Sequence, residues 1–161
     1  DRNMQSSVAD IYAAGDVAEA PDLFSNLPMV SAIQPNAADQ ARIAALNMAG
    51  KVAEHAGVLA INVLDTLGLI SSSFGQWEGV DGGDGVELSE PKYNRYISLQ
   101  FKDDVLVGAT SVGLTQHVGV LRGLIQGEVK LGDWKTTLMD EPSRVMDAYL
   151  ACAQRPMVLH G

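Results

Sequence analysis

The most regular alternation of apolar and polar residues lies in the second half of the chain. Residues 93–101 place large side chains at alternate positions, and a second apolar run, residues 105–112, follows a turn at Asp103 and Asp104. Successive side chains of a strand point to opposite faces, so this spacing predicts an antiparallel hairpin with one buried face. We expect strands at about 69–77, 93–102 and 105–113, which together form a three-stranded antiparallel sheet.

Apolar residues recur every three or four positions downstream of Asn36, which is the spacing of a helix. Asn36 follows Pro35 and is predicted to be the N-cap residue. The stripe is mostly alanine, so this helix can approach a neighbouring element closely. Gly57 is predicted to end the helix, and Gly50 marks either close packing or an early stop near residue 49.

Three shorter helices are predicted in the last third of the chain. The first begins at Thr115 and ends at Gly127, and the second runs from Asp133 to Met139. The third has Pro142 in its first turn. Its predicted inward residues are Val145, Met146, Tyr149 and Leu150.

The remaining segments are less regular. Ile11 to Ala14 is a short apolar run and predicts a buried strand. Residues 58–70 fit either a short strand or a helical turn capped by Gly68, and we favour a turn before the strand at 69–77. Residues 78–91 are rich in Gly, Asp and Glu and predict an exposed loop. These elements together predict an α+β fold.

Gly15 and Asp16 close the run from Ile11 to Ala14. A strand that stops there presents a carboxylate at its carboxyl end, where open α/β sheets bind ligands. Glycine permits backbone geometry that a Cβ hinders, and an ionised aspartate accepts hydrogen bonds from a polyol or ribose hydroxyl. The same dipeptide also ends many solvent-exposed strands, so both interpretations stay open on these residues alone.

Composition narrows the function classes. The chain has 161 residues, is 47% hydrophobic and carries a net charge of −9, which allows one domain, or a small domain with a piece of another. The negative charge argues against nucleic acid and anionic membranes as partners. The single cysteine excludes an internal disulfide and indicates a reducing compartment such as the cytoplasm. No apolar run is long enough for a membrane span.

Three consecutive segments carry a resemblance to a known family. They read Met4-Gln-Ser-Ser-Val-Ala-Asp10, then Ile11-Tyr-Ala-Ala-Gly-Asp16 with Val17-Ala-Glu-Ala20 after it, and then, after a gap, the helical segment from Pro35 to Gly50, whose last residues are Ala-Ala-Leu-Asn-Met-Ala-Gly50. This ordered set resembles the second flavin-binding motif of the FAD-dependent pyridine nucleotide-disulfide oxidoreductases, of the NADH:rubredoxin oxidoreductase and NAD(P)H-nitrite reductase type. Ser6 stands where the family usually has Thr, and Ala9 where it usually has Pro.

The resemblance implies a division of the chain and a cofactor. Residues 1–50 would form the C-terminal end of an FAD-binding domain, and residues 51–161 a C-terminal α+β cap or dimerisation domain. Asp16 would accept a hydrogen bond from the FAD ribityl chain. The amino end of the helix would face the pyrimidine edge of the isoalloxazine. The implied cofactor-binding residues are Gly15, Asp16, Asn36, Ala37, Ala38 and Gln40.

The implied activity is electron transfer from NAD(P)H through FAD to an unidentified acceptor, in a protein that forms a homodimer. The chain contains no Gly-x-Gly-x-x-Gly turn, the usual mark of a dinucleotide-binding unit. We therefore expect a C-terminal fragment of a longer protein that is inactive and without FAD by itself, and we assign it no catalytic residue. The alternative is a non-catalytic dimerisation or interaction module.

Other reactive residue types predict structural roles. The histidines at 55, 117 and 160 have no second His or Cys at metal-ligand spacing, so no metal site is predicted. Cys152 is predicted to be a small buried residue, and Trp77 and Trp134 to anchor the core. The acidic residues between 78 and 90 lack a calcium-loop pattern and predict a solvated loop. Arg42 and Asn47 are expected at the surface or in support of the site.

Overall fold

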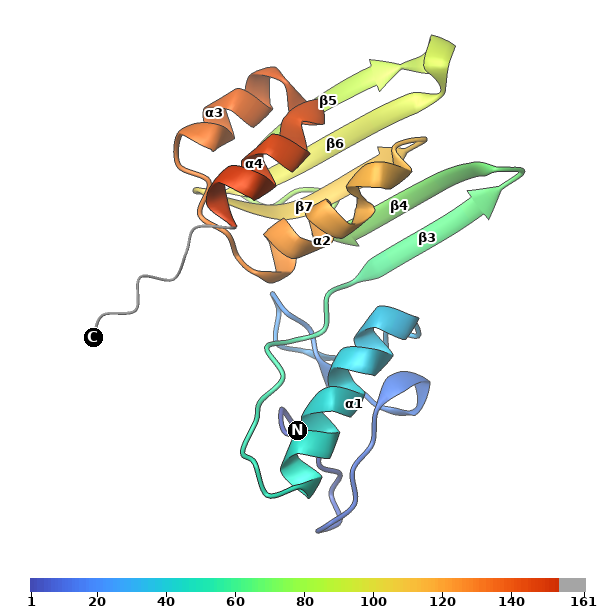
Figure 1. Cartoon of the computed structure of the whole chain (residues 1–161), viewed down its shortest axis with the longest axis vertical. Helices are drawn as coiled ribbons and strands as arrows, with labels where there is room; N and C mark the ends of the chain where they lie inside the picture. Colours follow the sequence, from blue (N-terminus) through green and yellow to red (C-terminus); the bar gives the residue numbers. More distant parts are fainter. Residues whose placement is uncertain (154–161) are drawn as a thin grey trace. The chain divides into compact units, whose positions relative to one another are not determined.

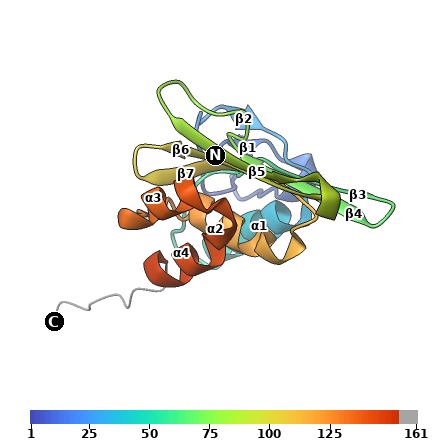
Figure 2. The same ribbon diagram turned by 90° about the horizontal axis from the view of Figure 1, so that it is seen from above.

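The computed structural model describes residues 1–153 and divides the chain into two compact units, Asp1–Ile61 and Asn62–Gly161. The first unit contains one long helix, α1 (Gln34–Met48), a short 3-10 turn, η1 (Gly15–Val17), and a two-stranded ribbon of β1 (Ala20–Pro21) and β2 (Pro28–Met29). Figure 1 labels α1, and Figure 2 also labels β1 and β2.

The second unit is built on one antiparallel sheet with the strand order β3-β4-β7-β6-β5. Its strands are β3 (Ile61–Thr66), β4 (Leu69–Gly75), β5 (Asp84–Glu90), β6 (Arg95–Lys102) and β7 (Val105–Val112). The helices are α2 (Val118–Gln126), α3 (Asp133–Asp140) and α4 (Val145–Cys152). The α+β fold and the hairpin of β6 and β7 are therefore confirmed, and the sheet has two strands more than the three predicted.

The two additional strands lie at the edges of the sheet. β5 occupies residues 84–90, half of the segment 78–91 that was predicted to be a loop, so that prediction was wrong for this half. It pairs along its whole length with β6, and its Val86 and Leu88 lie opposite Leu99 and Ile97. β3 precedes a two-residue turn, Leu67-Gly68, in which both residues have positive φ, 53° and 86°. This is the geometry of a tight type I′ hairpin rather than of a helical turn.

The helices of the second unit cover one face of its sheet, as Figures 1 and 2 show. The sheet contributes large, fully buried side chains to this layer, among them Phe74, Leu99 and Phe101. α2 adds Leu121, Leu124 and Ile125, α3 adds Leu138, and α4 adds Val145 and Ala148. Met146 and Leu150 of α4 are 37% and 49% exposed, so their predicted inward positions were wrong.

In the first unit, α1 begins earlier and ends earlier than predicted. Pro35 has the fixed φ that suits a first helical turn, so the helix starts at Gln34 and Asn36 is not the N-cap residue. The helix stops at Met48 and Gly50 adopts φ 76°, while Lys51 and Gly50 donate back to the carbonyls of Leu46 and Asn47. This is a Schellman motif, so the early stop is confirmed and the assignment of Gly57 was wrong.

The segment from Ile11 to Ala14 is not a buried strand in this chain. Its only ladder contact among the described residues is a bridge between Tyr12 and Gln5, and Ile11 is 53% exposed. A strand forms only where another strand pairs with it, and among the described residues of this unit only Gln5 pairs with the segment. The core of the unit consists of Met4, Ala20, Ile43, Ala44 and Val58, against which Tyr12, Met29 and Ala53 pack.

None of the helices within residues 1–153 is both long and apolar enough to cross a lipid bilayer.

Candidate functional site

The Gly15-Asp16 dipeptide lies against the first turns of α1. Gly15 has φ +80°, and a Cβ built on it would lie 3.4 Å from the Cβ of Ala37. The backbone N–H of Gly15 donates to Oε1 of Gln40 at 2.7 Å, and the N–H of Ala18 closes the turn onto the carbonyl of Gly15 at 2.9 Å. The structure thus brings three of the predicted site residues, Gly15, Ala37 and Gln40, into one place.

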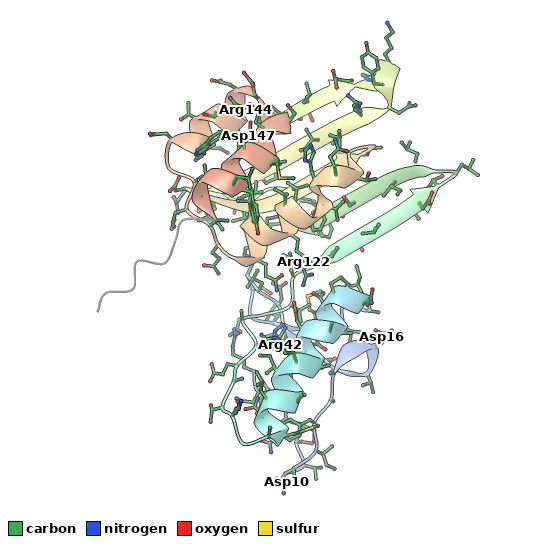
Figure 3. The ribbon with its side chains drawn as sticks, in the orientation of Figure 1. Asp10, Asp16, Arg42, Arg122, Arg144 and Asp147 are labelled. Atoms are coloured by element: carbon green, nitrogen blue, oxygen red, sulfur yellow. The ribbon has the colours of Figure 1, made fainter. Side chains whose placement is uncertain are left out.

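Asp16 occupies the middle of this turn and is exposed. Figure 3 draws it beside the amino-terminal half of α1, to which the turn packs. An exposed carboxylate can accept hydrogen bonds from the hydroxyl groups of a ligand, and the neighbouring helix start favours negative charge. The neighbouring Ala38 is exposed as well.

Asn36 points into the unit instead of toward solvent. Its side chain is 2% exposed, and its Nδ2 donates to Oγ of Ser31 at 2.8 Å and to the carbonyl oxygen of Leu59 at 2.9 Å. The first helical turn keeps backbone N–H groups without an intrahelical acceptor, as every helix does. Pro35 contributes none of them, so Gln34 and Asn36 supply the free backbone donors.

Two hollows flank the Gly15-Asp16 turn. One, of about 200 Å³, is apolar and lies between Tyr12–Ala14 and the alanines of α1. The other, of about 240 Å³, is polar and is lined by residues 4–7 and 17–19, among others. Each is smaller than the roughly 300–1,000 Å³ of an ordinary small-molecule pocket. A ligand of dinucleotide size therefore needs further walls.

Asn47, which was expected at the surface or in support of the site, and Arg2, for which no role was predicted, hold the first unit together. Nδ2 of Asn47 lies 3.1, 3.0 and 2.8 Å from the carbonyl oxygens of Asn3, Ile43 and Ala53, and its Oδ1 accepts the N–H of Ala53 at 3.1 Å. Nη1 of Arg2 donates to the carbonyls of His55 and Ala56 at 2.8 and 2.7 Å. Neither long-range set of contacts leaves a local signal in the sequence.

Two of the histidines have perturbed acid–base properties. Burial lowers the pKa of His55, an effect that the carboxylate of Asp39 opposes and that Arg2 and Arg42 reinforce. Its Nδ1 accepts the N–H of Gly57 at 3.1 Å. Burial also lowers the pKa of His117. The third histidine, at 160, lies outside the described residues.

The other candidates of the second unit take part in packing and ion pairs. Oδ2 of Asp84 accepts from Lys135 at 2.6 Å, and the Arg144 guanidinium lies 5.2 Å from the centre of the Trp134 ring. Cys152 is only half-buried, and its Sγ lies 3.5 Å from the carbonyl oxygen of Leu131. Within residues 1–153, no three His, Cys, Asp or Glu side chains gather in a way that could hold a metal ion.

Comparisons with known proteins show what the sequence and the fold of this chain are similar to. No protein-family model matches the sequence. The chain is 29% identical over 148 residues to the NADH-dependent phenylglyoxylate dehydrogenase subunit epsilon of Aromatoleum evansii, a match that covers 90% of this chain and 35% of the relative. The chain therefore spans about a third of the length of this curated relative.

Solved structures agree on the fold. The putidaredoxin reductase in its covalent complex with putidaredoxin matches with a TM-score of 0.71 and 21% identity, over 95% of this chain and 36% of that one. NADH:rubredoxin oxidoreductase from Clostridium acetobutylicum matches with a TM-score of 0.55 and 24% identity, over 81% of this chain and 32% of that one. An FAD-dependent pyridine nucleotide-disulphide oxidoreductase from Desulfovibrio vulgaris matches with a TM-score of 0.66 and 16% identity, over 94% of this chain and 40% of that one.

The chain has the fold of the C-terminal part of these FAD-dependent oxidoreductases. The resemblance seen in the flavin-motif residues 4–50 is thereby confirmed at the level of fold. Residues of this chain that fit the cofactor are the exposed Asp16 carboxylate and the first turn of α1, because both offer polar groups at one edge of an alanine-lined surface.

Proposed function

We propose that this chain is the C-terminal region of an FAD-dependent NAD(P)H oxidoreductase. The observation that carries the proposal is the close approach of the Gly15-Asp16 turn to Ala37 and Gln40 of α1. Separate parts of the flavin-like motif, 20 or more residues apart in the chain, meet in this arrangement. The relative from Aromatoleum evansii, whose name specifies NADH dependence, supports the nicotinamide as the electron donor.

The roles of individual residues follow from their chemistry. The Asp16 carboxylate accepts a hydrogen bond from a ribityl hydroxyl, and the absence of a side chain on Gly15 lets the backbone approach α1. The free backbone donors of Gln34 and Asn36 and the positive dipole end of α1 stabilise negative charge at the pyrimidine edge of a flavin. The chemistry that FAD supplies in such enzymes is hydride acceptance and onward electron transfer, while the protein binds and orients.

The apolar hollow beside the turn supports the same proposal. Its lining includes Met48, which is 63% exposed, and the neighbouring Ile11 is 53% exposed. Exposed apolar side chains around a hollow are typical of a surface that another element covers. We infer that the rest of an FAD-binding domain covers it. We also infer that residues 1–50 belong to the flavin-binding domain and residues 51–161 to the cap domain, of which residues 51–61 pack in the first unit.

A direct test uses the complete polypeptide that the gene encodes. We expect it to be purified with stoichiometric FAD and to be reduced by NADH or NADPH, whereas the 161-residue chain alone neither binds FAD tightly nor catalyses a reaction. Replacement of Asp16 by Ala should weaken FAD binding about tenfold to a hundredfold, the worth of a hydrogen bond to a charged group. Tight, stoichiometric FAD binding by the 161-residue chain would contradict the proposal that the pocket is shared.

The electron acceptor is proposed by class only. Relatives of this fold include reductases named for rubredoxin and in complex with putidaredoxin, both small redox proteins. We propose a small redox protein as the acceptor of the complete enzyme. A panel of such proteins, assayed with NADH and with NADPH in a reducing buffer that mimics the cytoplasm, identifies both the acceptor and the preferred nicotinamide.

A second function has its own observation, the apolar hairpin of β3 and β4. Leu64, Leu67 and Leu69 are 62%, 103% and 39% exposed, and β3 forms an edge of the sheet. Residues 61–66 contain neither lysine nor proline, the residue types that usually protect such an edge. We propose that this edge pairs with its copy in a homodimer, with or without flavin chemistry.

Sedimentation velocity separates these two candidates. Val63, which is 52% exposed on β3, is replaced by Lys, and Val52, which is 92% exposed in the first unit, serves as the matched control. We expect Val63→Lys to convert a dimer into a monomer and Val52→Lys to leave it dimeric. A coding sequence without two Gly-x-Gly-x-x-Gly units upstream of Asp1 would favour the non-catalytic module over the enzyme.

A further inference from the structure

Gln40 is the most deeply buried polar side chain of α1, with an exposed fraction of 1%. It lies on a helix whose packing face is otherwise made mostly of alanine and other apolar residues. A buried amide destabilises a protein unless its polar atoms have partners. Oε1 of Gln40 has one, the N–H of Gly15, at 2.7 Å and 25 residues away in the chain.

This hydrogen bond joins the turn at Gly15 and Asp16 to α1. Gly15 adopts φ +80°, and the space where its Cβ would stand is bounded by Ala37 at 3.4 Å. The backbone of Gly15 therefore has two contacts. It lies against α1, and its carbonyl oxygen accepts the N–H of Ala18 at 2.9 Å. Since Asp16 is the next residue, its carboxylate is placed by the same contacts.

We propose that Gln40 is a positioning residue: its amide oxygen holds the Gly15-Asp16 turn so that the Asp16 carboxylate meets a polyol hydroxyl beside the first turn of α1. Gln40 does not touch the ligand, because its side chain is buried and its oxygen is already engaged. This inference depends on the proposed function of Asp16, and it replaces direct cofactor contact by Gln40 with an indirect role.

Four variants of the complete protein test the inference, with the dissociation constant for FAD and the melting temperature as readouts. Asp16→Ala removes the carboxylate. Gln40→Met removes the acceptor at nearly constant volume, and Gln40→Glu keeps an oxygen that can accept the Gly15 N–H. The fourth variant combines Asp16→Ala with Gln40→Met, which completes a double-mutant cycle.

We expect Gln40→Met to weaken FAD binding about tenfold and Gln40→Glu to restore the affinity to within about threefold of the wild type, as loss and retention of one short hydrogen bond predict. In the Asp16→Ala background, Gln40→Met should weaken FAD binding by a further factor of less than about three, because both changes remove the same contact. Asn47→Ala, about two turns further along α1, controls for loss of stability: it should lower the melting temperature without a specific loss of FAD affinity.

The outcomes separate two kinds of failure. If Asp16→Ala leaves FAD binding unchanged, the proposed function of Asp16 is wrong. If Asp16→Ala weakens binding but Gln40→Met does not, or if the Gln40→Met loss persists fully in the Asp16→Ala background, the positioning role is wrong. Should Gln40→Met fail to fold, Gln40→Asn replaces it, because the shorter amide withdraws the oxygen while it keeps the polarity; the same losses are then expected.

Discussion

Asn47 offers the sharpest test of how the first unit is held together. Its amide joins α1 to residue 3 on one side and to residue 53 on the other, and Ala53 in turn donates to its Oδ1 at 3.1 Å. From the local pattern, Asn47 is expected only at the surface or in a supporting role. Because of these hydrogen bonds, Asn47→Ala should destabilise the unit although the side chain is only half-buried.

The magnitude follows from counting the partners that are lost. Nδ2 has two hydrogens, so it serves at most two of its three carbonyl neighbours well at one time. The carbonyl of Ala53 keeps a second donor, Nδ2 of Asn3 at 2.9 Å, and that of Ile43 belongs to the helix itself. The groups left without a partner are the carbonyl of Asn3 and the N–H of Ala53. At about 1 kcal/mol each, their loss predicts a decrease of about 2 kcal/mol in the free energy of unfolding.

Urea titration of the 161-residue chain measures this decrease. Both tryptophans, Trp77 and Trp134, lie in the second unit, so their fluorescence reports on that unit alone, whereas far-ultraviolet circular dichroism also follows α1. We expect Asn47→Ala to shift the dichroism transition and to leave the fluorescence transition in place. The control is Met48→Ala, a change at the next, 63% exposed residue, which should cost less than about 0.5 kcal/mol. Equal effects of the two substitutions would refute the argument.

Three further predictions concern packing and pH. Gly57→Ala should cost about 2–3 kcal/mol, measured by the same dichroism titration, because Gly57 has φ +140° and its new Cβ would stand 2.6 Å from Cα of Leu23; no loss would exclude this close approach. Phe74→Ala should cost about 3–5 kcal/mol in the tryptophan transition, because the ring is 1% exposed; a loss below about 1 kcal/mol would contradict that burial. Burial lowers the pKa of His55 and His117 from 6.5, so below that pH the unfolded chain binds more protons than the folded chain and stability should fall as pH falls. His55→Asn, which keeps an acceptor for Gly57, should flatten this decline in titrations between pH 7 and pH 5, and an unchanged slope would exclude His55 as a contributor.

The hairpin of β6 and β7 could be predicted because the sequence of each strand has a pattern typical of a buried strand. Alternation fixes the face that is buried, and Asp103, with φ 52°, makes the turn at the predicted place. β5 could not be recognised in the same way. An edge strand pairs with one neighbour only and buries one face only, so it needs few apolar residues. Val86 and Leu88 are therefore too few to indicate a strand among the Gly, Asp and Glu residues around them.

The errors around α1 and Ile11–Ala14 have a different origin. The pattern of Asn36 after Pro35 fits an N-cap locally, but the long-range contact from its amide to Leu59 requires it inside the helix. Ile11–Ala14 has the composition of a strand, yet strand formation depends on neighbours that a local pattern does not contain. Both errors arise where a distant part of the fold, rather than the local sequence, decides the conformation.

The candidate site shows how far such local patterns reach. The Gly15-Asp16 pair and the alanine-lined helix could each be found in the sequence, and the structure places them in contact. The bond that joins them could not, although a partial signal exists: Asn36 and Gln40 are two amides four residues apart on one face of α1, and both are almost fully buried. Polar residues are kept on a packing face when they have buried partners. Here Asn36 has Leu59 and Gln40 has Gly15. An amide pair of this kind on an otherwise apolar helix face therefore indicates two separate segments that the helix must hold, and in this chain one of the two carries the proposed flavin carboxylate.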